Sequence, residues 1–322
     1  MKKVLVGILI IFLIILGSSS YIYFSIFDKN NYNIEFTIKK NKSLSSQLAV
    51  IPKAKEIPFK LYLKYRNYGK NIKAGTYHIK GDYNFVELID ILEKGSDKLV
   101  KITIPEGYTV EQIADLLVEN YKMSKEKFYE ELNRAKENFP YPVPNGNFEG
   151  YLYPDTYLLP DTFNEETVVS QMLKEFLRQF PVKEYPDKEK FYEKLIMASI
   201  LEREALVAKE KPLMAGVFYN RIKKGMTLSS DATVNFLYNY KKKRMYYKDL
   251  KIDSPYNTYM YKGLPPAPIC NPDKVSVEAA YNPTETEYLF FVARGNGEHY
   301  FSKTYKEHLK FQNEKNKEKK SK

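Results

Sequence analysis

The most prominent hydrophobic pattern is an apolar stretch near the N-terminus. Residues 4–16 are apolar apart from one glycine, and after the small residues at 17–20 the apolar pattern resumes up to Phe27. These roughly 24 residues are enough to cross about 30 Å of hydrocarbon as a helix. Lys2 and Lys3 precede the stretch, so the positive-inside rule predicts a cytoplasmic N-terminus and an extracytoplasmic remainder.

A cleaved signal peptide is the alternative interpretation of this stretch. Residues 4–16 would be its hydrophobic region, and the serines at 18–20 would provide a small-residue cleavage site. We favour a retained single-pass anchor over residues 1–27, because the aromatic residues at 21–27 suit a membrane interface. No cysteine follows the apolar stretch, which argues against a lipoprotein.

An internal near-repeat follows the anchor. Residues 83–92 align without gaps on residues 108–117, at a spacing of 25. An alternating segment that predicts a strand precedes each copy, and each copy itself has helical spacing, with Asn84 or Thr109 placed to cap the helix. The pattern predicts two strand-helix units, and a weaker third copy includes residues 43–49.

The second half of the chain mixes helical patterns with loops. Residues 165–180 and 188–209 have helical periodicity, residues 288–293 resemble a strand, and residues 254–272 are rich in proline, glycine and tyrosine. The prolines within residues 139–147 predict a linker or domain edge, and the charged tail is predicted to be disordered. We therefore expect an α+β protein with the following parts: an anchor (1–27), an α+β region (28–138), a mixed α/β domain (139–312) and a tail (313–322).

Composition and charge narrow the class of protein only slightly. Of 322 residues, 43% are hydrophobic and 29 are tyrosines, which argues against a wholly disordered chain. The 51 Lys and Arg residues outnumber the 40 Asp and Glu residues, so an anionic partner is expected. Nucleic acid, lipid headgroups and an acidic cell-wall polymer all satisfy that expectation, although nucleic acid fits poorly with an exported chain.

The chemistry that remains after an inventory of motifs is that of carboxylates. The histidines, His78, His299 and His308, have no partner at zinc-site spacing, and the sequence contains no GxSxG, P-loop or GxGxxG motif. Cys270 is the sole cysteine and is interpreted as a small, partly buried residue. No metal and no cofactor are predicted.

Glu202 is the strongest candidate for a catalytic acid. On the helix predicted for residues 191–206, apolar and small side chains surround it at spacings of three and four. Burial disfavours the charged carboxylate and raises the pKa of the group, as a proton donor to a glycosidic oxygen requires. An ordinary partly buried glutamate is the alternative. Glu204 is interpreted as a solvated helix charge.

Three further segments have compositions suited to sugars. Residues 148–157 and 254–259 combine tyrosines with acidic or amide groups in predicted loops, although turn formation and edge packing would explain them too. Residues 101–109, followed by Ile113 and Ala114, resemble a LysM module, which binds glycans containing N-acetylglucosamine. A small packing domain without a ligand is the alternative for this LysM-like region.

Taken in order, the motifs resemble the YceG-like family of endolytic murein transglycosylases. The matching segments are residues 104–107, 148–157, 198–204, 217–221, 230–234, 255–259, 263–266, 271–272, 279–280 and 299–302. The family's catalytic glutamate is the first of the two in its Ala-Ser-Ile-hydrophobic-Glu motif, which corresponds to Glu202. The chain departs from the family pattern at Ser229 and Ala232, where glutamine and proline are usual, and at Ala267, where glycine is usual.

The resemblance implies cleavage of peptidoglycan between N-acetylmuramic acid and N-acetylglucosamine in nascent strands, with a 1,6-anhydro end as product. The C6 hydroxyl of the sugar would attack, and Glu202 would act first as acid and then as base. The candidates for substrate contact are Glu149, Asn220, Asp231, Tyr256 and Asn257.

Two other functions remain open at this point. A hydrolytic muramidase would use water and a second carboxylate, such as Glu149 or Asp231. A glycan-binding scaffold would use its LysM-like region and its anchor without cutting, with wall-synthesis enzymes as candidate partners. The expected partners are thus peptidoglycan strands and the cell membrane, with no nucleic acid.

Overall fold

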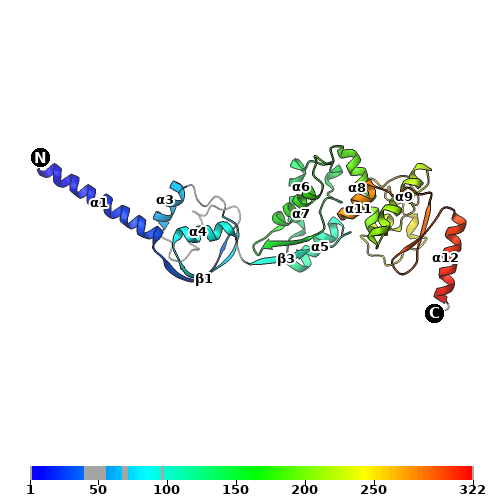
Figure 1. Cartoon of the computed structure of the whole chain (residues 1–322), viewed down its shortest axis with the longest axis horizontal. Coiled ribbons are helices and arrows are strands. Elements are labelled where there is room, and N and C mark those ends of the chain that lie inside the picture. Colours follow the sequence, from blue (N-terminus) through cyan, green and yellow to red (C-terminus); the bar gives the residue numbers. More distant parts are fainter. Residues whose placement is uncertain (1, 40–55, 67–71, 96–97, 321–322) are drawn as a thin grey trace. The chain divides into compact units, whose positions relative to one another are not determined.

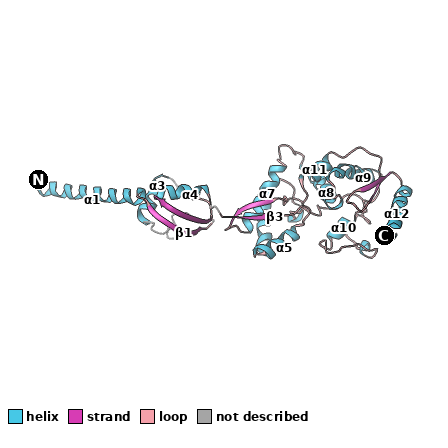
Figure 2. Ribbon diagram, turned by 60° about the horizontal axis from the view of Figure 1, so that its bottom comes forward, coloured by secondary structure: helices cyan, strands magenta, loops and turns pink. Residues whose placement is uncertain are grey.

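The chain forms two compact units in a computed structural model that describes residues 2–39, 56–66, 72–95 and 98–320 (Figure 1). Unit 1 comprises residues 1–102 and 158–163, and unit 2 comprises residues 103–157 and 164–322. Helices and two-stranded sheets occur in the chain, as expected for an α+β protein (Figure 2). The weaker third repeat copy, residues 43–49, lies outside the described residues.

Unit 1 is built around an antiparallel strand pair. β1 (Asn30–Ile38) pairs with β2 (Gly75–Tyr83) from Asn30↔Tyr83 to Ile38↔Gly75. Alternate residues of β1 are buried together with one face of α3 (Glu56–Arg66) and of α4 (Phe85–Lys94), as the period of two predicts. Asn84 and Glu87 form a capping box at the start of α4, which confirms the predicted cap.

The membrane-length helix α1 (Lys2–Phe27) contributes its last turn to this core. Ile26 is 3% exposed and packs in the same cluster as Phe59 and Phe85, with Ile22 partly buried against them. The stretch Leu9–Phe27 has a mean hydropathy of 2.1 and is long and apolar enough to cross a membrane. The predicted anchor is therefore not separate from the folded region that follows, because its end is part of the hydrophobic core.

Unit 2 carries most of the helices. They are α5 (Val110–Tyr121), α6 (Lys125–Ala135), α7 (Glu165–Gln179), α8 (Lys188–Glu204), α9 (Lys211–Lys223), α10 (Asp231–Phe236), α11 (Lys274–Tyr281) and α12 (Tyr305–Lys320). β5 (Phe290–Ala293) pairs with β6 (His299–Ser302) in antiparallel fashion. β3 (Leu99–Thr103) pairs with β4 (Thr156–Pro160), and the division between the units passes through these two strands.

The two repeat copies fold as predicted strand-helix units but belong to different units. β2 and α4 lie in unit 1, whereas α5, which follows β3 and is capped by Thr109, lies in unit 2. The expected region 28–138 therefore differs from the observed division. The physical reason is long-range pairing: Gly107 N–H donates to the Asn271 carbonyl at 2.9 Å, and this bond holds the segment after β3 within unit 2.

The segment predicted to be a linker, residues 139–147, is instead part of the core of unit 2. Tyr141 is 3% exposed, its ring stacks on Phe191 at 4.5 Å, and its hydroxyl donates to the Phe180 carbonyl at 2.8 Å. Proline ends regular structure, as expected, but it does not prevent neighbouring aromatic side chains from being buried. The prolines therefore mark a bend in the core rather than a domain edge.

Most element types in unit 2 agree with the sequence pattern, with two differences. The predicted helix 188–209 ends at Glu204, because Ala205 has an extended backbone (φ −102°, ψ 108°). The tail expected to be disordered continues α12 up to Lys320. Lysine and glutamate are good helix formers, so a charged composition is compatible with either state.

Candidate active site

Glu202 lies near the C-terminal end of α8. Asp187 caps the start of this helix by accepting a bond from the Lys190 N–H at 3.0 Å. Seven consecutive residues, 195–201, are buried, so the end of α8 is enclosed on all sides rather than on one face only. The Glu202 side chain is 7% exposed, so it is buried as expected, but the neighbours of its carboxyl group are polar and charged rather than apolar.

An extended segment, residues 269–273, runs beside α8 and leads into α11. The Ile269 N–H donates to Ser199 Oγ at 3.0 Å, and the Cys270 thiol donates to the Ser199 carbonyl at 3.2 Å. Cys270 is fully buried, as its interpretation as a packing residue requires. Asp273 then caps α11 by accepting the Ser276 N–H at 2.7 Å, which places the start of α11 against Glu202.

One oxygen of the Glu202 carboxyl group is fully occupied. Glu202 Oε2 accepts bonds from Ser276 Oγ at 2.7 Å, the Asp273 N–H at 3.1 Å and Lys211 Nζ at 3.1 Å. Oε1 accepts no hydrogen bond from any residue that the structure describes. A proton on this carboxyl group is therefore favoured on Oε1, since Oε2 already faces three donors.

The electrostatics favour the protonated form of Glu202. Burial raises its pKa above the usual range, and the nearby Asp273 charge raises it further, while the Lys211 ammonium opposes both. Burial also acts to raise the pKa of Asp273, but the Ser276 N–H, Glu202 and Lys211 together hold it below its usual value. In this coupled pair the proton belongs to Glu202, and Asp273 is the ionised partner of Lys211.

The loop after β3 forms the opposite wall of a cavity of about 460 Å³ beside Glu202. Gly107 has φ +74°, and a Cβ there would lie 3.3 Å from Arg203 Cδ and 3.6 Å from Glu202 Cγ, so the backbone approaches both side chains closely. Arg203 Nη1 donates to the Gly107 carbonyl at 3.2 Å, and its guanidinium lies 3.6 Å from the centre of the Tyr240 ring.

Three carboxyl groups converge on this cavity. Oxygens of Glu106, Glu202 and Asp273 lie within 4.8 Å of one another. Lys211 is 4% exposed and bonds to two of the three, at 3.1 Å to Glu202 and 3.3 Å to Asp273. The ammonium group therefore supplies the positive charge that these carboxylates need, and the arrangement can donate and accept a proton at Glu202.

Glu149, predicted to contact substrate, is buried and bonded within the protein, and its contact with substrate stays a prediction. It is 4% exposed and accepts the Val110 N–H at 3.1 Å, at the start of α5, together with Asn271 Nδ2 at 3.2 Å. Burial raises the pKa of Glu149 to about 8, although the bond from Val110 opposes the rise. Glu149 therefore links the start of α5 to the segment that leads to Asp273.

Two other candidates also bond within the protein. Asn220 Nδ2 donates to the carbonyls of Thr286 and Tyr288, at 2.7 and 3.2 Å. Asn257 is fully buried and its Nδ2 donates to two carbonyls in the segment before it. Neither residue lines the cavity beside Glu202. Both hold loops in place through these bonds, and their contact with substrate stays a prediction.

Asp231 and Tyr256 are more accessible. Asp231 is exposed and accepts a bond from the Tyr259 hydroxyl at 2.7 Å, while Tyr256 is half-buried with its ring 5.0 Å from Phe236. Neither lines the cavity beside Glu202. Glu204 differs from its predicted role as a solvated charge, because it accepts a bond from the Ser230 hydroxyl and burial raises its pKa.

The sequence pattern did not point to Lys211, Asp273 or Ser276 as members of the site. Lys211 is 9 residues from Glu202 along the chain, and Asp273 and Ser276 are 71 and 74 residues away. The sequence held only an indirect signal. Residues 104–107, which include Glu106, and residues 271–272, which precede Asp273, both belong to the matching motifs. Only the fold shows that these motifs meet at one carboxyl group.

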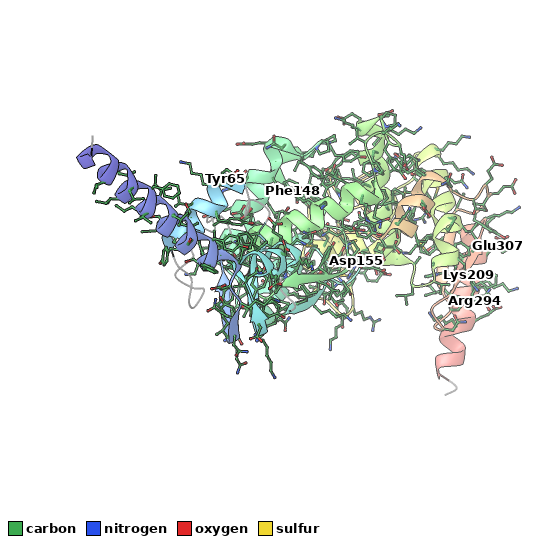
Figure 3. All side chains as sticks on the ribbon, turned by 60° about the vertical axis from the view of Figure 1, so that its left-hand side comes forward. Tyr65, Phe148, Asp155, Lys209, Arg294 and Glu307 are labelled. Carbon is green, nitrogen blue, oxygen red and sulfur yellow. The ribbon has the colours of Figure 1, made fainter. Side chains whose placement is uncertain are left out.

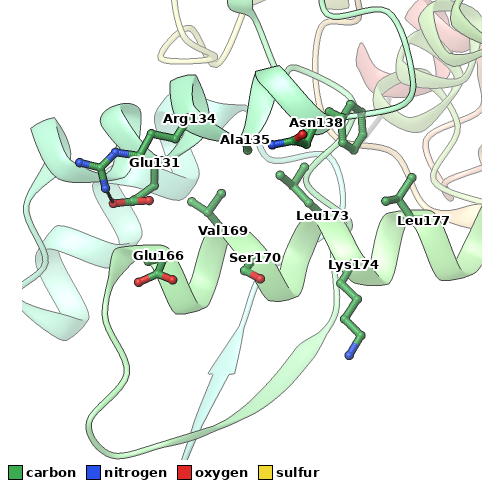
Figure 4. Close-up of a pocket in the computed structure, with 11 residues that line it drawn as sticks. Glu131, Arg134, Ala135, Asn138, Glu166, Val169, Ser170, Leu173, Lys174 and Leu177 are labelled. Carbon is green, nitrogen blue, oxygen red and sulfur yellow. Dashed lines mark hydrogen bonds and ion pairs between the residues drawn. The ribbon is translucent and has the colours of Figure 1, made fainter. Parts of the chain in front are cut away.

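A second hollow, of about 440 Å³, lies between α6 and α7 (Figure 4). Val169, Leu173 and Leu177 of α7 line it from one side and Ala135 from the other. Its charged members include Arg134 and Glu131, which bond to each other at 2.6 Å. Among the described residues that line this groove there is no converging group of three carboxyl groups like that beside Glu202, so the groove is not the candidate active site.

The fold and the cavity together define a two-unit α+β protein with a membrane-length N-terminal helix and one buried carboxylic acid at an open cavity. The profile of the YceG-like family matches residues 36–314. The chain therefore belongs to the YceG-like family, which confirms the resemblance recognised in its motifs.

Individual relatives agree with this assignment. A protein of Bacillus subtilis (strain 168) named "Endolytic murein transglycosylase" is 37% identical over 293 residues, which cover 85% of this chain and 78% of the relative. A protein of the same name from Streptococcus pneumoniae (strain R6) is 30% identical, and this chain spans about half (52%) of its length.

A crystal structure of a putative yceG-like protein from Listeria monocytogenes also matches. It has a TM-score of 0.59 and 34% sequence identity, and the match covers 86% of this chain and 98% of the other. The likeness therefore extends over most of the described chain rather than over the Glu202 motif alone.

Proposed function

We propose that this chain is a lytic transglycosylase that cleaves peptidoglycan strands internally, with Glu202 as the catalytic acid. The observation that carries the proposal is the asymmetric carboxyl group of Glu202: Oε2 is held by three donors, while Oε1 accepts no bond from the described residues. The names of the Bacillus and Streptococcus relatives support the substrate class.

The reaction needs one proton donor that later becomes an acceptor. Glu202 gives its proton to the oxygen that links N-acetylmuramic acid to N-acetylglucosamine, and the bond between the anomeric carbon and that oxygen breaks. The C6 hydroxyl of the muramic acid residue then attacks the anomeric carbon, and Glu202, now a carboxylate, takes the hydroxyl proton. No water is consumed, and the product carries a 1,6-anhydro end.

Asp273 and Lys211 are positioning residues in this proposal. The negative charge of Asp273 helps to keep the proton on Glu202, and the Lys211 ammonium stabilises the Glu202 carboxylate after the proton has left. These opposite effects on the pKa of Glu202 suit a group that must both donate and recover a proton. Asp231 and Tyr256 remain the candidates for substrate contact, whereas Glu149, Asn220 and Asn257 support loops.

The proposed setting is the outer surface of the cell membrane. Helix α1 anchors the chain, Lys2 and Lys3 keep its N-terminus inside, and both units lie outside, where peptidoglycan is found. The finer proposal that residues 28–138 include a LysM-like glycan-binding region rests on the sequence resemblance of residues 101–114, most of which lie in unit 2. For unit 1 it rests only on a strand pair with an intervening helix. Wall-synthesis enzymes are candidate partners at this location.

The ends of the products distinguish the proposal from its rivals. Purified glycan strands digested with the chain should yield 1,6-anhydro ends, which mass spectrometry detects as fragments lighter by one water than hydrolytic fragments. Reducing ends would favour the hydrolytic muramidase, with a second carboxylate such as Asp231. The absence of any new ends would favour a glycan-binding scaffold.

A further inference from the structure

Helix α3 of unit 1 has two apolar faces, of which the core uses only one. Phe59 and Leu63 are 2% and 7% exposed and pack in the core cluster. Ile57, Leu61 and Tyr65 are 74%, 49% and 86% exposed, and Figure 3 labels Tyr65 on this helix. Their four-residue spacing places these three side chains along one side of α3, where they form a continuous apolar surface, here called the α3 stripe.

The α3 stripe is carried by a helix that packs on the end of the membrane-length helix. The rings of Phe27 and Tyr62 lie 6.1 Å apart, and Ile26 shares the core cluster with the buried face of α3. The candidate membrane span ends at Phe27. A helix that packs against the last turn of a span is held at the level of the bilayer surface, where apolar side chains leave water.

The charges of α3 fit the same surface. Lys60 and Lys64 are exposed and alternate along the helix with the members of the stripe. A helix that lies in a membrane interface typically combines bulky apolar residues with lysines whose charges meet anionic headgroups. Tyrosine, here Tyr65, is also enriched at that level of the bilayer.

We propose that α3 is an interfacial helix: its stripe inserts into the headgroup region of the bilayer that holds α1, and its lysines bind anionic lipid. This inference rests on the anchor in the proposed function and extends it. Unit 1 is then held at the membrane by two elements, α1 and α3, rather than by α1 alone.

Depth measurements on the full chain test the inference. A fluorophore is attached to single cysteines placed at Phe12, Leu61 or Lys39, in protein reconstituted into vesicles that contain phosphatidylglycerol. The unsubstituted chain is the labelling blank, because Cys270 is fully buried. Brominated lipids should quench the labels at 12 and 61, and aqueous iodide should quench the label at Lys39, which is exposed at the far end of β1.

The three positions separate the possible failures. Lipid quenching at Phe12 with iodide quenching at Leu61 would overturn the interfacial helix alone and would leave the stripe as a surface for a protein partner. Iodide quenching at Phe12 would overturn the anchor and the interfacial helix together. Charge reversal by K60E and K64E should reduce lipid quenching at Leu61 but not at Phe12, and an unchanged signal at Leu61 would overturn the proposed binding of anionic lipid.

Discussion

At the scale of single residues, the proton on Glu202 is controlled by two neighbours of opposite charge. Asp273 raises the pKa of Glu202 and Lys211 lowers it. In the proposed mechanism, cleavage requires a protonated Glu202 at the start of the reaction, so we expect activity to be lost as pH rises through the pKa of Glu202. The alkaline limb of the pH profile of kcat/KM therefore reports the state of Glu202 in the free enzyme.

We expect the two neighbours to shift this limb in opposite directions. Asp273→Asn removes the negative charge but retains an oxygen for the Ser276 N–H, so the limb should move to lower pH. Lys211→Met removes the positive charge at similar length, so the limb should move to higher pH. Initial rates of glycan cleavage across the pH range measure both shifts, and movement in the same direction would contradict the assigned roles.

Glu149 should influence stability rather than substrate binding. Burial raises the pKa of Glu149 in the fold to about 8, above the 4.5 usual for a glutamate. The stability that its protonated form contributes is therefore full below about pH 4.5 and is lost as pH rises through about 8. Glu149→Gln, which cannot ionise, should flatten this loss, a change of a few kcal/mol at most. Denaturant unfolding at several pH values measures the slope.

The matched control for this experiment is Glu193→Gln, an exposed glutamate on α8. It should leave the pH dependence of unfolding unchanged. A raised KM in Glu149→Gln, with an unfolding slope equal to that of the wild type, would instead support the direct substrate contact expected from the sequence.

The sequence pointed to Glu202 as the proposed acid but not to the groups around it. Glu202 could be recognised because its apolar surroundings are local, three and four residues away on one helix. Its hydrogen-bond donors come from α9 and from the start of α11, so they could be assigned only after the chain had folded. For the same reason Asn257 suggested a sugar contact, whereas its amide serves the carbonyls of Leu250 and Ile252.

At the scale of elements, helix α1 has two roles along its length. Its N-terminal part is exposed and suited to lipid, whereas Ile26 at its end is buried in unit 1. Periodicity predicted the helix correctly, but a uniformly apolar sequence does not show where lipid contact ends and protein contact begins. Similarly, residues 139–147 contain prolines that end helices, but only the fold shows that Tyr141 is buried.

Because the end of α1 is part of the core of unit 1, the stability of a truncated chain should depend on where it starts. A chain that starts at Tyr21 keeps the turn with Ile22 and Ile26 and should remain folded without the membrane. A chain that starts at Asp28 loses the buried Ile26 side chain, which contributes about 1.5–3 kcal/mol. We expect lower thermal stability and faster proteolysis of unit 1 in the shorter chain, and equal stability of the two chains would contradict the packing of α1.

At the scale of the whole molecule, the two units have different proposed functions. Unit 2 carries the Glu202 cavity, and unit 1 carries the membrane-length helix and a strand pair for which glycan binding is proposed. The sequence predicted the order of these parts, but the boundary depends on the pairing of the loop after β3 with residues far along the chain. The Pro-Glu-Gly motif in that loop, interpreted as LysM-like, lines the Glu202 cavity.

The proposed role of unit 1 in wall binding can be tested by its removal. A chain that starts at Lys98 keeps β3 and all of unit 2 but loses β1, β2, α3 and α4. Compared with the chain that starts at Tyr21, it should pellet less with insoluble peptidoglycan and should still cut short soluble strands. Equal pelleting would count against glycan binding by unit 1.

The central claim is that Glu202 transfers the proton in glycan cleavage. Glu202→Gln keeps the shape of the side chain and an oxygen acceptor but cannot exchange a proton, so the rate should fall by about 10²- to 10⁴-fold or more while folding is retained. Glu193→Gln on the same helix is the control, since Glu204 is half-buried and bonded to Ser230 and is thus not an inert comparison. The decisive measurement is the rate at which 1,6-anhydro ends appear in purified glycan strands. We expect near-complete loss in Glu202→Gln alone, and substantial formation of 1,6-anhydro ends by that variant would contradict the role proposed for Glu202.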